Sequence, residues 1–353
     1  MYLTNLDRIL WFRDTKPPCA ANDALATVGP LLHPHSMTEK LLRIGSRASR
    51  LALWQAEHVA QRLQAIDDGI SVEIVTIKTT GDINLDSPLS KIEGKGFFTK
   101  EIEKALLEER VDLAVHSLKD LETSMPRGLT IAAVLEREDP RDVLIGREGV
   151  KLDDLPSRSV VGTSSLRRKA WLSHLRPDLQ TSDLRGNVPT RLQKYRDGDF
   201  DCLILAAAGV KRLGFEQHIA EYLPPDRFSP AVSQGALAVQ VREGHTTTLD
   251  SVAPLDHAET RAATFAERAM LHRLEGGCQV PVGALGTVRS GTLTLTGAVC
   301  SLDGSSLVKG ERSGAVSQCE KIGESLAETL LADGAGTILE QIREQVGKKQ
   351  EHD

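Results

Sequence analysis

Apolar runs alternate with amphipathic stretches from residue 41 to about residue 241. Two segments, LLRIGSRASRLALWQ (41–55) and VVGTSSLRRKAWL (160–172), show the same order of a buried strand, a short polar turn and a helix. This alternation predicts parallel or mixed sheets with helices on both faces. Because ligands of such folds bind at the carboxyl ends of the strands, polar residues that follow a strand are the candidate site residues.

The two ends of the chain have different patterns. TFAERAMLHRL (264–274) is amphipathic, which predicts a helix that stops at the glycine pair 276–277. Residues 1–36 show no periodicity, and their apolar cluster Ile9–Phe12 is too short for a signal-peptide core or a membrane span. We interpret them as a disordered extension or the product of a start codon assigned too early. A plastid transit peptide is the less favoured alternative, because the segment contains acidic residues.

The cysteines indicate the compartment. The chain has five, with no CxxC pair and no metal-ligand spacing, so we expect a reducing, cytoplasmic location and no metal site. Cys202 and Cys300 lie in apolar runs and are expected to be buried. Cys278, in LEGGCQVPVG, has neither a base beside it nor a helix N-terminus beneath it. A free thiol on a loop is therefore an open interpretation.

Charge is distributed unevenly. The formal net charge is -6, yet residues 158–212 contain eleven Lys and Arg against five Asp. This local excess predicts an anionic ligand. Aromatic residues make up 4% of the chain, fewer than a nucleic-acid surface generally uses, so we favour a small polycarboxylate and expect no nucleic-acid partner. Neither a P-loop nor a GxGxxG motif occurs, so no nucleotide is indicated.

The cationic motifs lie where predicted helices begin. Hydroxyls and backbone amides over 163–165 can bind a carboxylate there, and Arg167 and Arg168 add planar guanidinium groups that bind two oxygens at once. Arg47 and Ser49 form the same arrangement of a guanidinium and a hydroxyl at the predicted helix start in the segment 41–55. Further cations follow other predicted elements, at Arg185, Arg191 and Arg212. The alternative interpretation is a solvated, basic helix face.

One carboxylate stands out in VDLAVHSLKDL (111–121). The run 111–115 predicts a short buried strand, with Ser117, Lys119 and Asp120 at its carboxyl end. There Asp120 would face the cationic site and could stabilise a developing positive charge or move protons on nitrogen. An ordinary surface pair of Asp120 with Lys119 is the alternative.

Taken together, nine motifs resemble the porphobilinogen deaminase family, also called hydroxymethylbilane synthase. The resemblance runs from about residue 41 to the C-terminus and rests on RIGSRASRLALWQ, KTTGD, GKGFFTKEIE, DLAVHSLKDL, VGTSSLRR, LRGNVPTRL, AAAGVKRLG, PAVSQGALAV and LEGGCQVPVG, in the order and spacing of the family. It implies an α/β fold with two lobes like those of periplasmic binding proteins, built on mixed sheets, and a smaller α+β C-terminal domain.

The resemblance also implies a chemistry. Members of the family condense four porphobilinogen units head to tail, with loss of ammonia, onto a covalently bound dipyrromethane cofactor, and release hydroxymethylbilane by hydrolysis. Cys278 matches the cysteine that holds this cofactor through a thioether, so it needs no base. Asp120 matches the catalytic aspartate. We expect porphobilinogen as the substrate, a monomer, and neither a nucleic-acid nor a membrane partner.

Further matched positions imply binding of cofactor or substrate, largely through carboxylates. They are Arg47, Ser49, Gln55, Lys95, Phe98, Ser117, Lys119, Thr163, Ser164, Ser165, Arg167, Arg168, Arg185, Arg191 and Arg212. The family departs from this chain at two positions, where it has proline in place of Glu122 and glycine in place of Ser233.

The resemblance implies domain boundaries as well. We expect an extension over 1–38, a first domain over 39–138 and 234–254 with an active-site lid at 78–96, a second over 139–233 and a third over 255–353. The alternative to an enzyme is a two-lobed carboxylate-binding protein without catalysis, for which Cys278 would have no special use.

Overall fold

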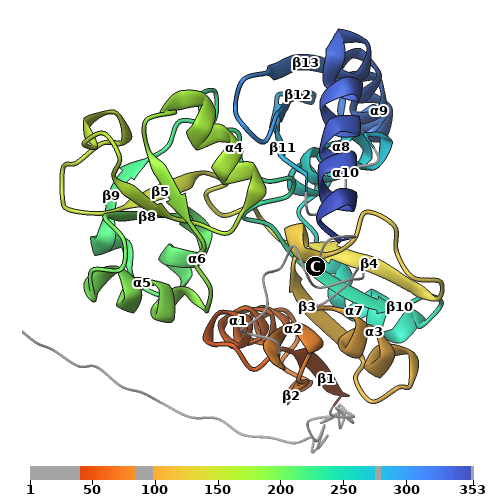
Figure 1. Ribbon diagram of the computed structural model, residues 1–353. Coiled ribbons are helices and arrows are strands. Elements are labelled where there is room, and N and C mark those ends of the chain that lie inside the picture. The colour runs from red at the N-terminus through yellow and green to blue at the C-terminus, as the bar shows by residue number, and fades with distance from the viewer. Residues whose placement is uncertain (1–39, 84–97, 275–279, 351–353) are drawn as a thin grey trace, which may run out of the picture. The chain divides into compact units, whose positions relative to one another are not determined.

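The computed structural model describes residues 40–83, 98–274 and 280–350. Within these ranges the chain forms three sheets, two of five strands and one of three (Figure 1). The two larger sheets are mixed, and the smallest is antiparallel. The predicted fold class, with two α/β lobes and a separate C-terminal unit, is confirmed.

The first sheet has the order β2-β1-β3-β10-β4. Its strands are β1 (Lys40–Ser46), β2 (Ile70–Thr76), β3 (Leu113–Ser117), β4 (Leu129–Val134) and β10 (Leu237–Arg242). β1 runs parallel to β2 and β3, whereas β10 runs antiparallel to β3 and β4. In Figure 1, β10 and β4 lie side by side although their colours are far apart in the bar, since the chain returns to this sheet after leaving it.

The helices that belong with this sheet are α1 (Arg50–Ile66), α2 (Thr80–Ile83), α3 (Lys100–Leu107) and α7 (Thr246–Val252). The buried face of α1 presents Val59 and Leu63 to Ile44 and Leu113 of the sheet, all at 0% exposure. Burial of one such aliphatic side chain contributes about 1.5–3 kcal/mol. This packing fixes the start of α1 beside the carboxyl end of β1.

The second sheet has the order β7-β6-β8-β5-β9. Its strands are β5 (Asp142–Ile145), β6 (Val160–Gly162), β7 (Gln180–Ser182), β8 (Cys202–Ala206) and β9 (Ile219–Tyr222), and its helices are α4 (Leu166–Leu175), α5 (Val188–Arg196) and α6 (Ala207–Arg212). Trp171 of α4 is fully buried in a core with Cys202 and Phe228. The carboxyl end of β6 therefore meets the start of α4, as the sequence pattern predicts.

The third sheet, β11-β12-β13, packs with the C-terminal helices. Its strands are β11 (Val282–Arg289), β12 (Thr292–Cys300) and β13 (Leu307–Ala315), and its helices are α8 (Ala258–Arg273), α9 (Cys319–Leu330) and α10 (Gly336–Gln350). Gly323 lets α9 approach α8 closely, because a Cβ atom there would lie 2.2 Å from the carbonyl oxygen of Ala266. Met270, Leu295 and Leu326 fill the core between these helices and the sheet.

Several local predictions can be compared with these bounds. Cys202 and Cys300 are buried as expected, and burial raises the pKa of the two thiols to about 12 and about 11. The strand predicted at 111–115 begins and ends two residues later. It continues through His116 because the polar ring of this residue is also buried and bonded to Gln240 in the same sheet. The predicted helix at 264–274 begins earlier, at Ala258.

Other predictions concern residues that the structure does not describe. The predicted extension lies outside the described residues, and of the predicted lid only 78–83 is described. In the part of the chain that is described, no helix is long and apolar enough to cross a membrane.

Ser233 has an unusual backbone conformation. Its φ is 62°, a left-handed value that favours glycine, and the residue is fully buried with no hydrogen-bond partner for its hydroxyl among the described residues. We therefore expect Ser233→Gly to raise the free energy of unfolding by about 1 kcal/mol, measured by urea denaturation. Ser290→Gly is the comparison, because Ser290 also has a positive φ, 48°, but is exposed; it should gain only the part of the stability that comes from relief of backbone strain. A Ser233→Gly variant that is less stable than the parent would contradict the strain at this position.

Candidate functional site

A pocket lies at the carboxyl ends of β1 and β3. Twelve residues line it: Arg47, Ser49, Leu51, Ala52, Gln55, Phe98, Thr99, Ile102, Val115, His116, Ser117 and Asp120. Six of these, namely Arg47, Ser49, Gln55, Phe98, Ser117 and Asp120, are residues that the sequence analysis singled out. Segments up to 73 residues apart along the chain therefore meet at the predicted edge of the sheet.

Local contacts hold the pocket in shape. Ser49 caps α1, its hydroxyl accepting a hydrogen bond from the Ala52 amide at 3.3 Å. Gln55, one turn along α1, donates from Nε2 to the Ser117 hydroxyl at 2.9 Å and so links α1 to the end of β3. The guanidinium carbon of Arg47 lies 4.1 Å from the centre of the Phe98 ring, a cation–π distance.

Asp120 ends the short 3₁₀ turn Leu118–Asp120 that follows β3. The residue is exposed, and within the described ranges its carboxylate makes no hydrogen bond or ion pair. Its neighbour Lys119 instead donates from Nζ to Gln234 Oε1 at 3.3 Å. An ordinary Asp120–Lys119 surface pair, the alternative drawn from the sequence, is therefore not formed.

A buried polar chain lies behind the same pocket, and the sequence analysis did not identify it. His116 is 6% exposed, and its Nε2 lies 3.1 Å from Gln240 Oε1, while Gln240 Nε2 lies 3.4 Å from a carboxylate oxygen of Glu103. Since Glu103 accepts from the Gln240 amide nitrogen, the Gln240 oxygen accepts from His116 Nε2–H. Burial lowers the pKa of His116 to about 4, so this ring is neutral at pH 7.

The second group of predicted residues surrounds the start of α4. Ser165 caps the helix, its hydroxyl accepting from the Arg168 amide at 3.4 Å, and Thr163 Oγ1 accepts from the Ser165 amide at 3.3 Å. Ser164 has a different use, since its hydroxyl bonds both the carbonyl and the amide of Leu184 at 3.0 and 2.9 Å. Ser164 thus anchors the segment that carries Arg185.

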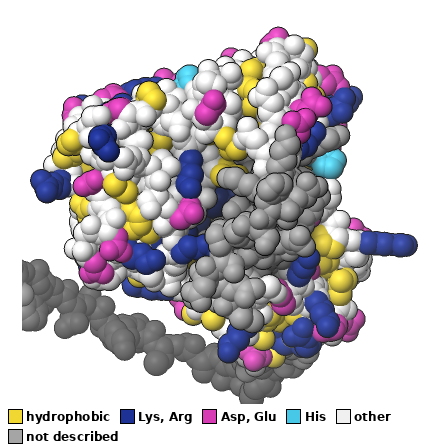
Figure 2. Space-filling view, in the orientation of Figure 1, with side chains coloured by type: hydrophobic (Ala, Val, Ile, Leu, Met, Phe, Trp, Pro, Cys, Tyr) yellow, Lys and Arg dark blue, Asp and Glu magenta, His cyan; other side chains and the backbone are white. Residues whose placement is uncertain are grey.

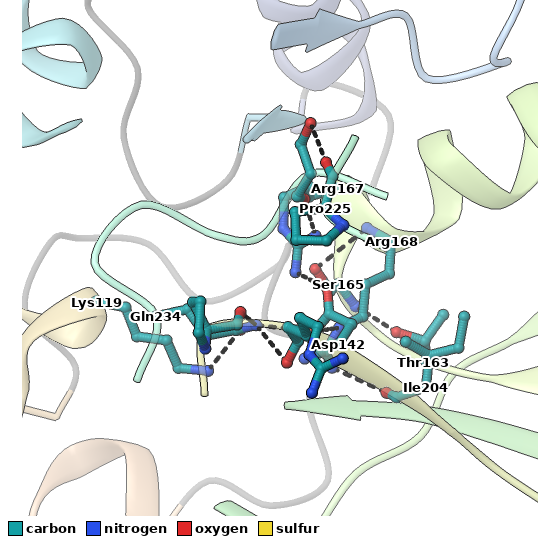
Figure 3. Close-up of polar contacts among 12 residues, drawn as sticks. Lys119, Asp142, Thr163, Ser165, Arg167, Arg168, Ile204, Pro225 and Gln234 are labelled. Carbon is teal, nitrogen blue, oxygen red and sulfur yellow. Dashed lines mark hydrogen bonds and ion pairs between the residues drawn. The ribbon is translucent and has the colours of Figure 1, made fainter. Parts of the chain in front are cut away.

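Asp142, at the start of β5, holds both predicted arginines of α4. Its carboxylate accepts from Arg167 Nη2 and from Arg168 Nη2, each at 2.7 Å, and its side chain has 0% exposure (Figure 3). Burial by itself would raise the pKa of Asp142, but the two guanidinium groups hold it down at about 2. Each arginine also donates to one carbonyl, that of Ser229 or of Ile204.

A continuous polar path joins this cluster to the turn of Asp120. Gln234 donates from Nε2 to Asp142 Oδ1 at 3.1 Å and accepts from Lys119 at its oxygen (Figure 3). Desolvation, helped by the nearby charges of Arg168 and Arg167, lowers the pKa of Lys119 to about 8 against the opposing effects of Asp120 and Asp142. Lys119 is therefore a cation whose charge is easily lost unless an anion stabilises it.

Arg185 and Arg191 add positive charge for which the described residues supply no ion-pair partner. Arg185 has a buried Nη2 with no hydrogen-bond partner in the described part of the chain. Burial lowers the pKa of Arg191 to about 10, and the nearby charges of Arg168 and Arg185 contribute to the shift. In the space-filling view, Lys and Arg side chains lie in and beside a hollow near the middle of the face shown (Figure 2). An anion would relieve this crowding of like charges.

The described structure does not place the remaining predicted residues in the pocket of Asp120. Arg212 lines a second pocket with Arg50 and Trp54, donates from Nη2 to the Gly235 carbonyl at 2.7 Å, and lies over the Trp54 ring at 5.6 Å. Cys278 and Lys95 lie outside the described residues. No group of His, Cys, Asp and Glu among the described residues could hold a metal ion.

The contacts of Asp142 predict a large effect on stability. Asp142→Asn would leave two buried guanidinium groups without their counter-charge, and we expect it to lower the free energy of unfolding by about 3–5 kcal/mol in urea denaturation. Because the folded pKa of about 2 lies below the ordinary 3.8, the stability supplied by Asp142 is present above the ordinary pKa and lost as pH falls towards 2. The variant should lack this acid-side dependence.

The control is Asp153→Asn in the same lobe, whose ion pair with Arg227 is half-exposed. It should change the free energy of unfolding by less than about 1 kcal/mol. Equal effects of the two substitutions would contradict the structural role of Asp142.

The mixed sheets, with cationic groups at the carboxyl ends of β1, β3 and β6, define an α/β protein with a candidate site suited to an anion. Comparison with known proteins then identifies the family. The description "Porphobilinogen deaminase, dipyromethane cofactor binding domain" matches residues 42–250, and "Porphobilinogen deaminase, C-terminal domain" matches residues 262–332. The chain belongs to the porphobilinogen deaminase family.

Curated relatives agree with this assignment. A porphobilinogen deaminase of Geobacter metallireducens is 52% identical over 306 residues, which make up 87% of this chain and 96% of the relative. One from Syntrophotalea carbinolica is 52% identical over 303 residues, covering 86% of this chain and 96% of the relative.

Solved structures show weaker likenesses. A TRAP periplasmic solute binding protein from Desulfovibrio salexigens has a TM-score of 0.38 and 11% identity, covering 62% of this chain and 72% of that one. A probable amino-acid transporter binding protein from Bacillus subtilis has the same TM-score and identity, covering 61% and 90%.

Proposed function

We propose that this chain condenses four porphobilinogen units into hydroxymethylbilane on a dipyrromethane cofactor attached to Cys278. In each step the carbon–nitrogen bond to the departing ammonia breaks, a carbon–carbon bond forms between two pyrrole units, and the α-carbon that forms this bond loses its proton. Hydrolysis then releases the tetrapyrrole. The observation that carries the proposal is Asp120, an exposed carboxylate without a partner among the described residues, in a pocket that Arg47 also lines. Membership of the family and the 52% identity to curated deaminases support it.

The residues of the site fit the cofactor. Each pyrrole of a dipyrromethane carries acetate and propionate groups, and the structure offers the unpartnered Arg185 Nη2 and the crowded charges of Arg168 and Arg191. Planar guanidinium groups suit such carboxylates. The cofactor, when bound, supplies the nucleophilic pyrrole carbon to which the first substrate unit is joined.

The chain's own residues then act on the charge of the substrate. Loss of ammonia leaves positive charge on a pyrrole nitrogen, and the Asp120 carboxylate supplies a negative charge for it from a turn fixed at the end of β3. Lys119, Arg167 and Arg168 supply cations for the side-chain carboxylates. Asp142 keeps the two arginines oriented, so their remaining N–H groups need no large rearrangement to meet an anion.

We also propose the expected domain organisation. The return of β10 to the first sheet supports the assignment of 234–254 to the first domain, and β5 to β9 support a second domain over 139–233. The third sheet and its helices support a third over 255–353, while 1–38 would be an extension. We further propose a cytoplasmic monomer that binds no nucleic acid, which light scattering and retention on DNA at low salt would test.

The direct test of the activity is stoichiometry. Purified protein incubated with porphobilinogen should release one ammonia for each porphobilinogen consumed and form one linear tetrapyrrole for every four. A carboxylate-binding protein without catalysis would bind porphobilinogen, seen by calorimetry, without releasing ammonia. That outcome would replace the proposed function with the alternative.

A further inference from the structure

Arg268 of α8 contacts the turn that carries Asp120. The residue is 7% exposed, and its Nη1 donates to the Leu121 carbonyl at 3.1 Å and reaches the Leu118 carbonyl at 3.5 Å. Its Nη2 donates to the carbonyl of Glu122. These three carbonyls belong to residues on both sides of Asp120 in the sequence, so one rigid guanidinium group spans the whole turn.

Little else holds this turn by hydrogen bonds. Its backbone is fixed by the Leu118 amide, which donates to Ala236 at 3.0 Å, and by the Leu121 amide, which donates to Leu118 at 3.2 Å. The amide of Glu122 donates no hydrogen bond within the described ranges. Without Arg268, the carbonyls of Leu121 and Glu122 would lose a charged donor in a buried environment, which favours other conformations of the turn.

We propose that Arg268 is a positioning residue that holds Asp120 in its catalytic orientation, an inference that rests on the proposed function. Arg268 does not touch the substrate in this account. It acts by fixing the path of residues 118–122, and thereby the place of the carboxylate relative to the pocket. A displacement of a catalytic group by about 1 Å can cost about a hundredfold in rate, so the effect should be large.

The first test is Arg268→Met, which keeps most of the side-chain volume and removes the donors. We expect the kcat of cofactor-loaded protein to fall about ten- to a hundredfold while KM changes less than about threefold. Hydrogen exchange of the peptide that contains residues 118–122 should become faster, in cofactor-free protein as well, since Arg268 no longer holds the Leu118 carbonyl that accepts from the Leu121 amide.

Arg261→Met is the matched control. Arg261 lies on the same helix and donates to the carbonyls of Ile131 and Ala132 and to Asp256, away from the catalytic turn. Its loss should lower the melting temperature and speed exchange around β4, but change kcat less than about threefold. Equal kcat losses in the two variants, or unchanged exchange over 118–122 in Arg268→Met, would overturn the proposal.

A rescue experiment separates positioning from general stability. Leu121 has φ −80° and ψ 135°, the conformation favoured before proline, and the Glu122 amide donates no hydrogen bond within the described ranges, so Glu122→Pro should restrict the turn without removing a hydrogen bond. The double variant Arg268→Met with Glu122→Pro should recover part of the lost kcat. If Arg268→Met does not fold, Arg268→Lys tests the same point, with an intermediate loss of kcat that Glu122→Pro reduces. No rescue in either background would contradict the proposal.

Measurement of Asp120→Asn beside these variants distinguishes a failure of the proposed catalytic role of Asp120 from a failure of the proposed positioning role of Arg268. Near-normal turnover in Asp120→Asn would remove the proposed role of Asp120. A large loss in Asp120→Asn with normal kcat in Arg268→Met would leave that role intact and overturn only the positioning role of Arg268.

Discussion

Asp120→Asn should lower the single-turnover rate by about a hundredfold or more, with little change in substrate affinity. Asparagine has nearly the same shape and still accepts a hydrogen bond, but it presents no negative charge. If the carboxylate stabilises cationic pyrrole species as they form, its loss costs roughly 3–4 kcal/mol, as for a missing oxyanion donor. Affinity should change little because the cations of Arg47, Lys119 and α4 remain.

The measurement requires protein that is confirmed by mass to carry the cofactor. Folding should be unaffected, because Asp120 is exposed and makes no hydrogen bond within the described residues that the substitution would break. Near-normal turnover, or a loss explained wholly by missing cofactor, would show that the catalytic charge lies elsewhere.

Cys278→Ser should fold but remain without cofactor, and its turnover should fall to background. A serine ether does not readily replace a thioether, so the variant should have the mass of the bare polypeptide and give no colour with an aldehyde reagent for pyrroles. Its melting temperature should lie below that of the loaded protein, because a ligand that binds only the folded state stabilises it.

Cys319→Ser is the matched control for this substitution. Cys319 begins α9 and is partly exposed, far along the chain from every motif of the site. This variant should keep its cofactor and its activity. Full activity in Cys278→Ser would show that the cofactor is not held by that thiol.

Much of the fold could be predicted from the sequence because the decisive signals are local. The period of the apolar residues and the capping serines predict where α1 and α4 begin, and Ser49 and Ser165 do cap these helices. Since strands of one sheet end at a common edge, residues after β1 and β3 could be expected to meet, and Arg47, Gln55 and Asp120 line one pocket.

The contacts that orient the site could not be predicted in this way. Asp142 lies at the start of an apolar strand, and nothing in its neighbourhood signals that Arg167 and Arg168 will bind it. The links from Gln234 to Lys119 and from Arg268 to the catalytic turn depend on pairings across 115 or more residues. Only the tertiary packing determines such pairings. The excess of positive charge over 158–212 indicated an anion site. It did not indicate how much of this charge the internal carboxylate of Asp142 already neutralises.

The most direct test of the central claim is the intact mass of the purified protein before and after addition of less than four equivalents of porphobilinogen. We expect a starting mass equal to the polypeptide plus two pyrrole units, followed by species that are heavier by one further pyrrole unit at each step. A starting mass equal to the bare polypeptide, unchanged while the protein binds porphobilinogen, would contradict it.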